Sequence, residues 1–482
     1  MLDTAESGAN FLYRQVIEMI SDNIDRGALR PGDRLPSLRK MSRQAGVSVP
    51  TVRQAYIELE RQRRVEARPK SGFYVRHVSR NDLVAATGNP DGPPVSCSCR
   101  NLMERVYDGV NDPALVPLGI ANPTMVKPAA KGLHRSMKRV LARAEERVLH
   151  YACTLGEPQL RRQIAWHYLD TIGETVDPDQ VCITNGGQEA LLLALNAVAA
   201  AGDVIAVETP TYHGLLELID SLGMLAIEVE TCPEEGVTIA ALEATLQQHP
   251  VKACMFSTTL GNPLGVTMPD DARRRLVELL VRHDCALLED DVYGDLRFDG
   301  RRPVPAQFVN PDAKIMTCGS FSKTVAPGYR VGWIYAGESI DAIERLKRAF
   351  SCSSGLLQQM TLAEFLASGD YQRHLKALRP ELKRNADRMS ALIAQHFPAE
   401  TRSSQPDGGG VLWLELPESV DGENLFDRAI EAGISIVPGR ISSPRGDYRN
   451  FIRLAYGHPW CDETEAAIRW LGQEVTATAA AR

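Results

Sequence analysis

Short apolar runs alternate with helical segments from Gly119 onward, and this alternation limits the fold more than any other feature of the chain. The runs VCIT (181–184) and ALLED (286–290) are typical, because each is short, apolar and followed by a loop rich in small or polar residues. The intervening segment 188–200 has the composition of a helix. Strands that alternate with helices form mostly parallel sheets covered on both faces, and ligands bind at the carboxyl ends of such strands. We therefore expect an α/β fold with its binding loops at one edge of the sheet.

Residues 1–80 differ in charge from the rest of the chain. They carry 15 Lys or Arg and nine Asp or Glu, a formal charge of +6, whereas the whole chain of 482 residues has −7. A chain of this length is too long for one core, so the basic segment is expected to be a domain of its own. A solvated basic face would explain the charge, and so would a surface that binds nucleic acid.

Three helices and a hairpin are expected in this basic segment. Apolar residues recur at helical spacing between Asn10, placed to cap a helix, and Gly27, placed to end it. A second short helix is expected between Ser37 and Gly46, and a third starts after the capping residue Ser48. Two short helices joined by a glycine turn form a helix-turn-helix, whose second helix enters the major groove of DNA.

The stretch GALRPGDRLPSLRKMSRQAGVSVPTVRQAYIELERQRRVEARPKSGFYV resembles the winged-helix DNA-binding domain of the GntR family. The resemblance covers residues 9–77. It implies that double-stranded DNA is a partner, with contacts to the phosphate backbone, to the bases and, through the wing, to the minor groove. The residues that it assigns to these three kinds of contact are Arg39 and Ser48, Thr51 and Arg53, and Gly72, respectively.

Residues 78–112 are expected to be a flexible linker. They include TGNPDGPPVSCSCRN, are rich in Gly, Pro, Asn and Ser, and show no sustained periodicity. The pair Cys97 and Cys99 lacks further ligands at metal spacing, so no metal site is expected. The remaining segment, 113–477, is the expected α/β domain.

A phosphate-binding group is expected where the first of these strands meets its helix. Gly186, Gly187 and Gln188 open the helix, so their backbone N–H groups and the helix dipole can hold a phosphate. Further donors lie in the stretch TCGSFSKTVAPGYRVGW (317–333), at Ser320, Ser322 and Arg330.

Other strand ends carry residues suited to an aromatic aldehyde. Asp290 suits a protonated pyridine nitrogen, Asn262 and Tyr293 can hydrogen-bond a phenolate oxygen, and Tyr212 can stack on a ring. Lys323, in small apolar surroundings, would have a lowered amine pKa and could form a Schiff base. Each residue alone also fits an ordinary cap, turn or core position. Phosphate, ring nitrogen, phenolate and aldehyde together describe pyridoxal 5′-phosphate.

The motifs YACTLGEPQLR, TNGGQEAL, TPTYHG, GNPLG, EDDVY, SFSKTVAPGYRVGW and FIRLAYG resemble the fold-type I, aspartate-aminotransferase-like enzymes that use pyridoxal 5′-phosphate. The resemblance implies a mostly parallel sheet with a smaller C-terminal α+β domain. It makes Lys323 the catalytic lysine of the internal aldimine and Arg453 the residue that binds an effector's α-carboxylate. Tyr151 would reach the phosphate of a neighbouring subunit, which implies a homodimer.

A GntR-type domain joined to such a domain is similar to the MocR family of bacterial transcriptional regulators, and the motifs are closest to its YdcR-like branch. The resemblance implies a domain-swapped dimer that senses an amino acid or amine through aldimine exchange at Lys323. An active aminotransferase with an accessory DNA-binding domain is the alternative, and a DNA-binding protein with an inactive body is a third. No apolar run approaches the ~20 residues that span a bilayer, so a cytoplasmic location without membrane contact is expected.

Overall fold

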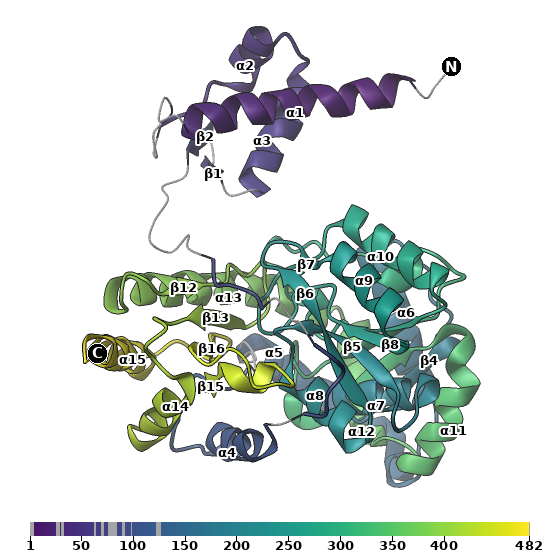
Figure 1. The fold of residues 1–482 in the computed structure, drawn as a ribbon. Helices are drawn as coiled ribbons and strands as arrows, with labels where there is room; N and C mark the ends of the chain where they lie inside the picture. The colour runs from purple at the N-terminus through teal and green to yellow at the C-terminus, as the bar shows by residue number, and fades with distance from the viewer. Residues whose placement is uncertain are drawn as a thin grey trace. The chain divides into compact units, whose positions relative to one another are not determined.

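The computed structural model describes residues 4–25, 29, 33–61, 64–68, 72–75, 84–88, 92–97, 99–121 and 127–481 (Figure 1). The chain divides into two compact units, Met1–Asp82 and Leu83–Arg482. We call them the head and the body and describe each by itself.

The head consists of three helices and a two-stranded hairpin. Its elements are α1 (Thr4–Asp25), α2 (Leu38–Ala45), α3 (Val49–Arg61), β1 (Val65–Arg68) and β2 (Gly72–Val75). The strands β1 and β2 are antiparallel, with Val65 opposite Val75. Buried residues of all five elements, among them Ile20, Met41 and Tyr56, form one core. The head is therefore the winged helix-turn-helix that the sequence predicts.

Local signals set the ends of α2 and α3. The Ser37 hydroxyl accepts a hydrogen bond from Lys40 N, and α2 ends at Gly46, whose φ of 67° lies in the left-handed region. The helix α1 begins earlier than predicted, at Thr4 and not at Asn10. The apolar residues expected at helical spacing in this segment include Leu12, Val16, Met19 and Ile20; Val16 and Ile20 are buried, whereas Leu12 and Met19 are exposed.

The body is built on an eight-stranded sheet of order β4-β11-β10-β9-β8-β5-β6-β7. The strands are β4 (Val181–Thr184), β5 (Val204–Thr209), β6 (Leu225–Cys232), β7 (Gly236–Val237), β8 (Val251–Phe256), β9 (Ala286–Asp290), β10 (Ile315–Ser320) and β11 (Gly332–Tyr335). The five central strands from β10 to β6 are parallel, while β11 runs antiparallel to both β10 and β4. The prediction of a mostly parallel sheet is confirmed.

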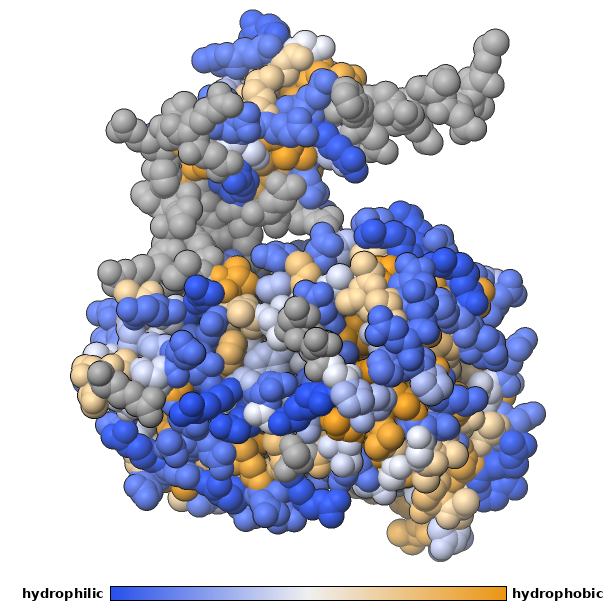
Figure 2. All heavy atoms as spheres, in the orientation of Figure 1, coloured by the Kyte–Doolittle hydropathy of each residue, from blue (hydrophilic) through white to orange (hydrophobic). Residues whose placement is uncertain are grey.

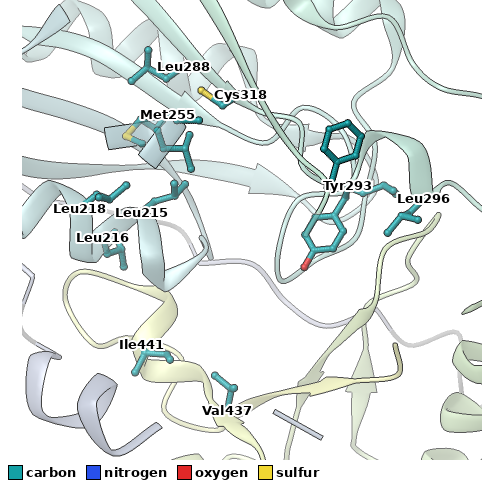
Figure 3. Close-up of a cluster of buried hydrophobic side chains, with 14 of the residues drawn as sticks. Leu215, Leu216, Leu218, Met255, Leu288, Tyr293, Leu296, Cys318, Val437 and Ile441 are labelled. Atoms are coloured by element: carbon teal, nitrogen blue, oxygen red, sulfur yellow. The ribbon is translucent and has the colours of Figure 1, made fainter. Parts of the chain in front are cut away.

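Helices cover both faces of this sheet, as Figure 1 shows. The helices of this part of the chain are α5 (Lys127–Ala144), α6 (Pro158–Ile172), α7 (Gly187–Val198), α8 (His213–Ser221), α9 (Ile239–Gln248), α10 (Asp270–Arg282), α11 (Ile340–Phe350), α12 (Leu356–Ala367) and α13 (Asp370–His396). Alternate residues of a strand point to opposite faces of the sheet. Met255 and Leu288 belong to the larger core on one face (Figure 3), whereas Cys254 and Leu287 pack with α9 and α10 in a second cluster.

The C-terminal part of the body is a smaller α+β region, also as predicted. Its four-stranded sheet has the order β12-β13-β16-β15. The elements are β12 (Arg402–Ser403), β13 (Val411–Glu415), α14 (Gly422–Glu431), β15 (Val437–Pro438), β16 (Phe451–Ala455) and α15 (Asp462–Ala480). A short strand β14 (Ile434–Ser435) pairs in parallel with β3 (Val116–Pro117).

The structure differs from the predicted linker at its C-terminal end. Residues Arg100–Asn111 form a helix, α4, whose Leu102, Met103 and Val106 are buried in the larger core of the body. Upstream of α4, Val95 bridges to Ala226. The apolar face of α4 is only three turns long, and its stability comes from packing on the body, which local composition does not reveal.

Across the part of the chain that the structure describes, no helix is long and apolar enough to cross a membrane. Figure 2 shows a face on which hydrophilic residues predominate and apolar residues form smaller areas.

Candidate cofactor and effector site

A cavity of about 340 Å³ lies where the central strands of the body end. Strands β9 and β10, the first turns of α7 and α8, helix α4 and strand β16 all contribute side chains to it. It brings together eleven of the residues predicted from the sequence: Gly187, Gln188, Tyr212, Asn262, Asp290, Tyr293, Ser320, Ser322, Lys323, Arg330 and Arg453. Its size suits a cofactor together with a small ligand.

Lys323 follows β10 and points its amine into this cavity. The Nζ atom donates a hydrogen bond to the carbonyl oxygen of Ala121 at 3.0 Å. Burial, aided by the positive charge of Arg453, lowers the pKa of Lys323 from 10.5 to about 8. A larger fraction of this amine is therefore neutral, and so nucleophilic, at neutral pH than for an ordinary lysine.

Asp290 is the last residue of β9 and is buried. Burial raises the pKa of its carboxyl group to about 6, although Val292 N donates a hydrogen bond to Oδ1 at 3.3 Å and Lys323 lies near enough to oppose the rise. At pH 7 the group is mostly ionised. A buried carboxylate of this kind suits a cation such as a protonated pyridine nitrogen.

Arg453, in β16, is buried and also lines the cavity. It donates to Asn262 Oδ1 at 3.3 Å and to the carbonyl oxygen of Gly119 at 2.8 Å. Within the described residues, Arg453 Nε and the Tyr293 hydroxyl are buried and make no hydrogen bond. Buried polar atoms rarely stay unpaired, so these two donors indicate that a ligand with anionic or carbonyl oxygens completes the site.

The turn between β4 and α7 has the geometry of an anion-binding site. Gly186 has a φ of 85°, and a Cβ there would lie 2.5 Å from a guanidinium nitrogen of Arg330. Arg330 donates to the carbonyl oxygen of Asn185 at 3.0 Å, which holds its charge beside the N-terminus of α7. The hydroxyls of Ser320 and Ser322 lie 3.0 Å apart. Backbone N–H groups, hydroxyls and a guanidinium together suit a phosphate.

Gln188 contributes its backbone to this turn, because its side chain donates to the carbonyl oxygen of Gly214 at 2.9 Å. Tyr212 precedes α8, and its ring contacts the ring of His213 edge-on, with the centroids 4.8 Å apart. Burial lowers the pKa of His213 well below its usual value, so this imidazole is neutral.

Ten lining residues of the cavity were missed by the sequence analysis, and three of them, Tyr107, His213 and Glu217, have polar side chains. Tyr107, on α4, donates its hydroxyl proton to Glu217 Oε2 at 2.9 Å. Its apolar neighbours Leu102, Met103, Val106 and Val110 have helical spacing, but the stripe is too short to predict a helix after a Pro- and Gly-rich stretch, and nothing in it singles out Tyr107.

Tyr151 does not line the cavity of its own chain. Its side chain is 87% exposed, and Leu149 beside it is 80% exposed. A tyrosine so exposed is available to a second molecule.

In the head, the residues predicted to contact DNA lie around the start of α3 and on the wing. The Ser48 hydroxyl accepts from Thr51 N at 3.3 Å and lies 2.7 Å from the Thr51 hydroxyl, so it caps α3. Arg39 and Arg53 are exposed. Gly72 has a φ of 117°, a conformation that favours glycine. The tip of the wing, including Lys70, lies outside the described residues.

Comparison with protein families gives two matches. Residues 116–467 match the aminotransferase class I and II family, and residues 12–75 match the bacterial regulatory proteins of the gntR family.

Relatives with both parts are similar over nearly the whole chain. The HTH-type transcriptional regulators YjiR and YdcR of Escherichia coli (strain K12) are each 35% identical to it, over 96% of this chain and 98% of theirs. Among solved structures, LysN, the α-aminoadipate aminotransferase of Thermus thermophilus, is 26% identical with a TM-score of 0.70. The similarity covers 80% of this chain and 100% of the LysN chain, and LysN was solved with N-(5′-phosphopyridoxyl)-L-leucine.

Proposed function

We propose a function on the premise that the chain belongs to the aminotransferase class I and II family, and within it to the HTH-type transcriptional regulators that carry an N-terminal GntR domain. It is a DNA-binding regulator that depends on pyridoxal 5′-phosphate. We infer further that an amino acid bound in the cavity of the body changes the affinity of the protein for its operator.

The observation that carries this proposal is the cavity itself. Donors for a phosphate, a carboxylate for a ring nitrogen and a lysine with a lowered pKa line one space, and a buried arginine lines it as well. When bound, pyridoxal 5′-phosphate supplies an aldehyde that combines with primary amines.

Each residue has a role in this assignment. The N-terminus of α7, the two serines and Arg330 hold the phosphate, and Asp290 keeps the ring nitrogen protonated. Asn262 and Tyr293 orient the phenolate oxygen. Lys323 would supply the amine that combines with the aldehyde, and an effector amine would compete with Lys323 for it.

Arg453 selects an effector with a carboxylate. Its guanidinium is buried and retains an unpaired Nε, so an α-carboxylate would supply the missing acceptor. The lining of the same cavity includes Val106, Val110 and Ile120, which are apolar. We therefore propose that the effector is an amino acid with an apolar or aromatic side chain.

The protein acts as a homodimer in this proposal. The exposed side chains of Leu149 and Tyr151 support it, because Tyr151 would donate to the phosphate held by the partner subunit. In the domain-swapped form that we propose, the two heads bind two half-sites of one operator. An effector that favours one conformer of the body would change how well both heads fit; a coupling of about 1–3 kcal/mol is typical of allosteric proteins.

An aminotransferase is the second candidate function. Lys323, Asp290 and Arg453 line one cavity, and these are the groups that such an enzyme would use. Release of a keto acid from the effector during many turnovers would favour this candidate over sensing alone.

The deciding experiment is an operator titration. The protein is titrated onto operator DNA without cofactor, with pyridoxal 5′-phosphate, and with cofactor plus each of a panel of amino acids, while the visible spectrum is recorded. We expect one amino acid to change the spectrum and to shift the DNA affinity by about five- to 150-fold. Identical DNA affinity under all conditions would overturn the sensing proposal.

A further inference from the structure

We propose that Lys347 is a positioning residue for the phosphate-binding turn, acting through Glu189. Lys347 lies on α11 and does not line the cavity. Its side chain has no exposed surface. A buried ammonium group is retained only where its charge and hydrogen bonds are compensated, so its partners define its role.

All three protons of the Lys347 amine have acceptors within the body. Nζ donates to Glu189 Oε2 at 3.0 Å, to Ser351 Oγ at 3.0 Å and to Ser354 Oγ at 2.9 Å. An ammonium has three donors, so this set leaves none unused. The amine therefore fixes one oxygen of Glu189 in place.

Glu189 connects Lys347 to the turn between β4 and α7. It lies in the first turn of α7 and accepts two hydrogen bonds from Asn185, one from the backbone N–H to Oε2 and one from Nδ2 to Oε1 at 3.1 Å. Burial alone would raise the pKa of Glu189, but the bonds from Ser351 and Asn185 and the charge of Lys347 lower it, so the group is ionised.

Asn185 also contacts Arg330, the arginine of the proposed phosphate site. Its carbonyl oxygen accepts from Arg330 at 3.0 Å. The next residue, Gly186, accepts from the Thr184 hydroxyl at 2.9 Å and packs so closely on Gly332 that a Cβ on Gly332 would lie 2.6 Å from its carbonyl carbon. The chain from Lys347 through Glu189 to Asn185 thus sets where the first N–H groups of α7 point.

The experiment compares pyridoxal 5′-phosphate with pyridoxal, which has the same aldehyde, ring nitrogen and phenolate but no phosphate. We expect Lys347→Met to weaken binding of pyridoxal 5′-phosphate by about tenfold or more, the loss of a hydrogen-bonded charge. Binding of pyridoxal should stay within about twofold, because the turn has no phosphate to hold. Both are measured by the absorbance that develops on binding.

Two further variants keep the test decisive. Glu189→Gln keeps the side-chain size but removes the charge, and it should show the same selective loss even if Lys347→Met does not fold. Arg273→Met is the matched control: Arg273 is also buried, on α10, and donates to the carbonyl oxygens of Thr258 and Met268 outside the cavity. It should lose stability without phosphate selectivity.

Equal loss for both ligands, no loss for either, or the same selectivity in Arg273→Met would overturn the inference. The inference rests on the assignment of the cavity as the cofactor site. If the wild-type protein bound neither ligand, both the assignment of the cavity and the inference about Lys347 would be wrong. If the wild type bound pyridoxal 5′-phosphate and the variants bound it equally well, only the role of Lys347 would be wrong. DNA and effector are absent from the experiment, so the regulatory proposal is not at stake.

Discussion

Lys323 owes its chemical role to its surroundings. Its amine lies in a cavity with two arginines, and its pKa of about 8 results from burial and from the charge of Arg453. Below pH 8 the fraction of neutral amine falls about tenfold per pH unit. We expect the rate at which pyridoxal 5′-phosphate binds covalently to rise with pH and to level off above about pH 8. Stopped-flow absorbance would measure it, and a midpoint near the ordinary 10.5 would contradict the assignment.

Replacing the amine tests the same residue directly. Lys323→Ala should abolish the visible absorbance that develops when pyridoxal 5′-phosphate is added, because no amine then lies at the aldehyde. Lys314→Ala is the control, since Lys314 is exposed and paired with Asp284 at 2.6 Å. An unchanged band in Lys323→Ala would show that another amine binds the cofactor.

Sequence motifs were informative for residues that contribute their own chemistry to the cavity. Lys323, Asp290 and Arg453 come from segments far apart in the chain. Asp290 and Lys323 lie at the ends of apolar runs that predict strands, whereas Arg453 is assigned through the resemblance of its motif. Neither Tyr107 nor Lys347 lies in a sequence motif of this kind. Their roles depend on which acceptors the fold brings to them, and only the structure gives those contacts.

At the level of elements, α3 presents its polar residues on an exposed face. Arg53→Ala should weaken operator binding by about 1–3 kcal/mol if the guanidinium makes a bidentate contact to a base. Arg14→Ala, an exposed arginine on α1, should have a smaller effect and a sequence-independent one. Fluorescence anisotropy with operator and scrambled DNA would measure both. Unchanged operator affinity in Arg53→Ala would exclude α3 as the recognition helix.

The strands β4, β5, β8, β9 and β10 of the body and the helices α2 and α3 could be predicted because local signals agree with the fold. Ser37 and Gly46 bound α2, and the run 286–290 is apolar enough to be a buried strand on its own. Helix α4 could not be predicted, because its short apolar face follows a Pro- and Gly-rich stretch. The helix is stable only when it packs against the body. The early start of α1 at Thr4 was missed because the prediction placed the helix cap at Asn10.

For the whole molecule, the expected assembly is a dimer. Sedimentation analysis should give a mass about twice the 53.0 kDa of the chain. Tyr151→Phe removes only the exposed hydroxyl, so it should keep that mass and weaken binding of pyridoxal 5′-phosphate by about tenfold or more, as expected for a lost hydrogen bond to a charged group. A monomer, or a variant with unchanged cofactor affinity, would contradict the shared site.

The place of α4 in the chain bears on how such proteins diversify. This helix of 12 residues lines the effector cavity, yet it lies between the two family matches, 12–75 and 116–467. If this cavity binds the effector as proposed, substitutions in α4 can change which metabolite is detected without altering the residues proposed to hold the cofactor and the DNA. Exchanging this one segment between paralogues is thus a short evolutionary route to a new inducer, and the same route is open to engineered biosensors.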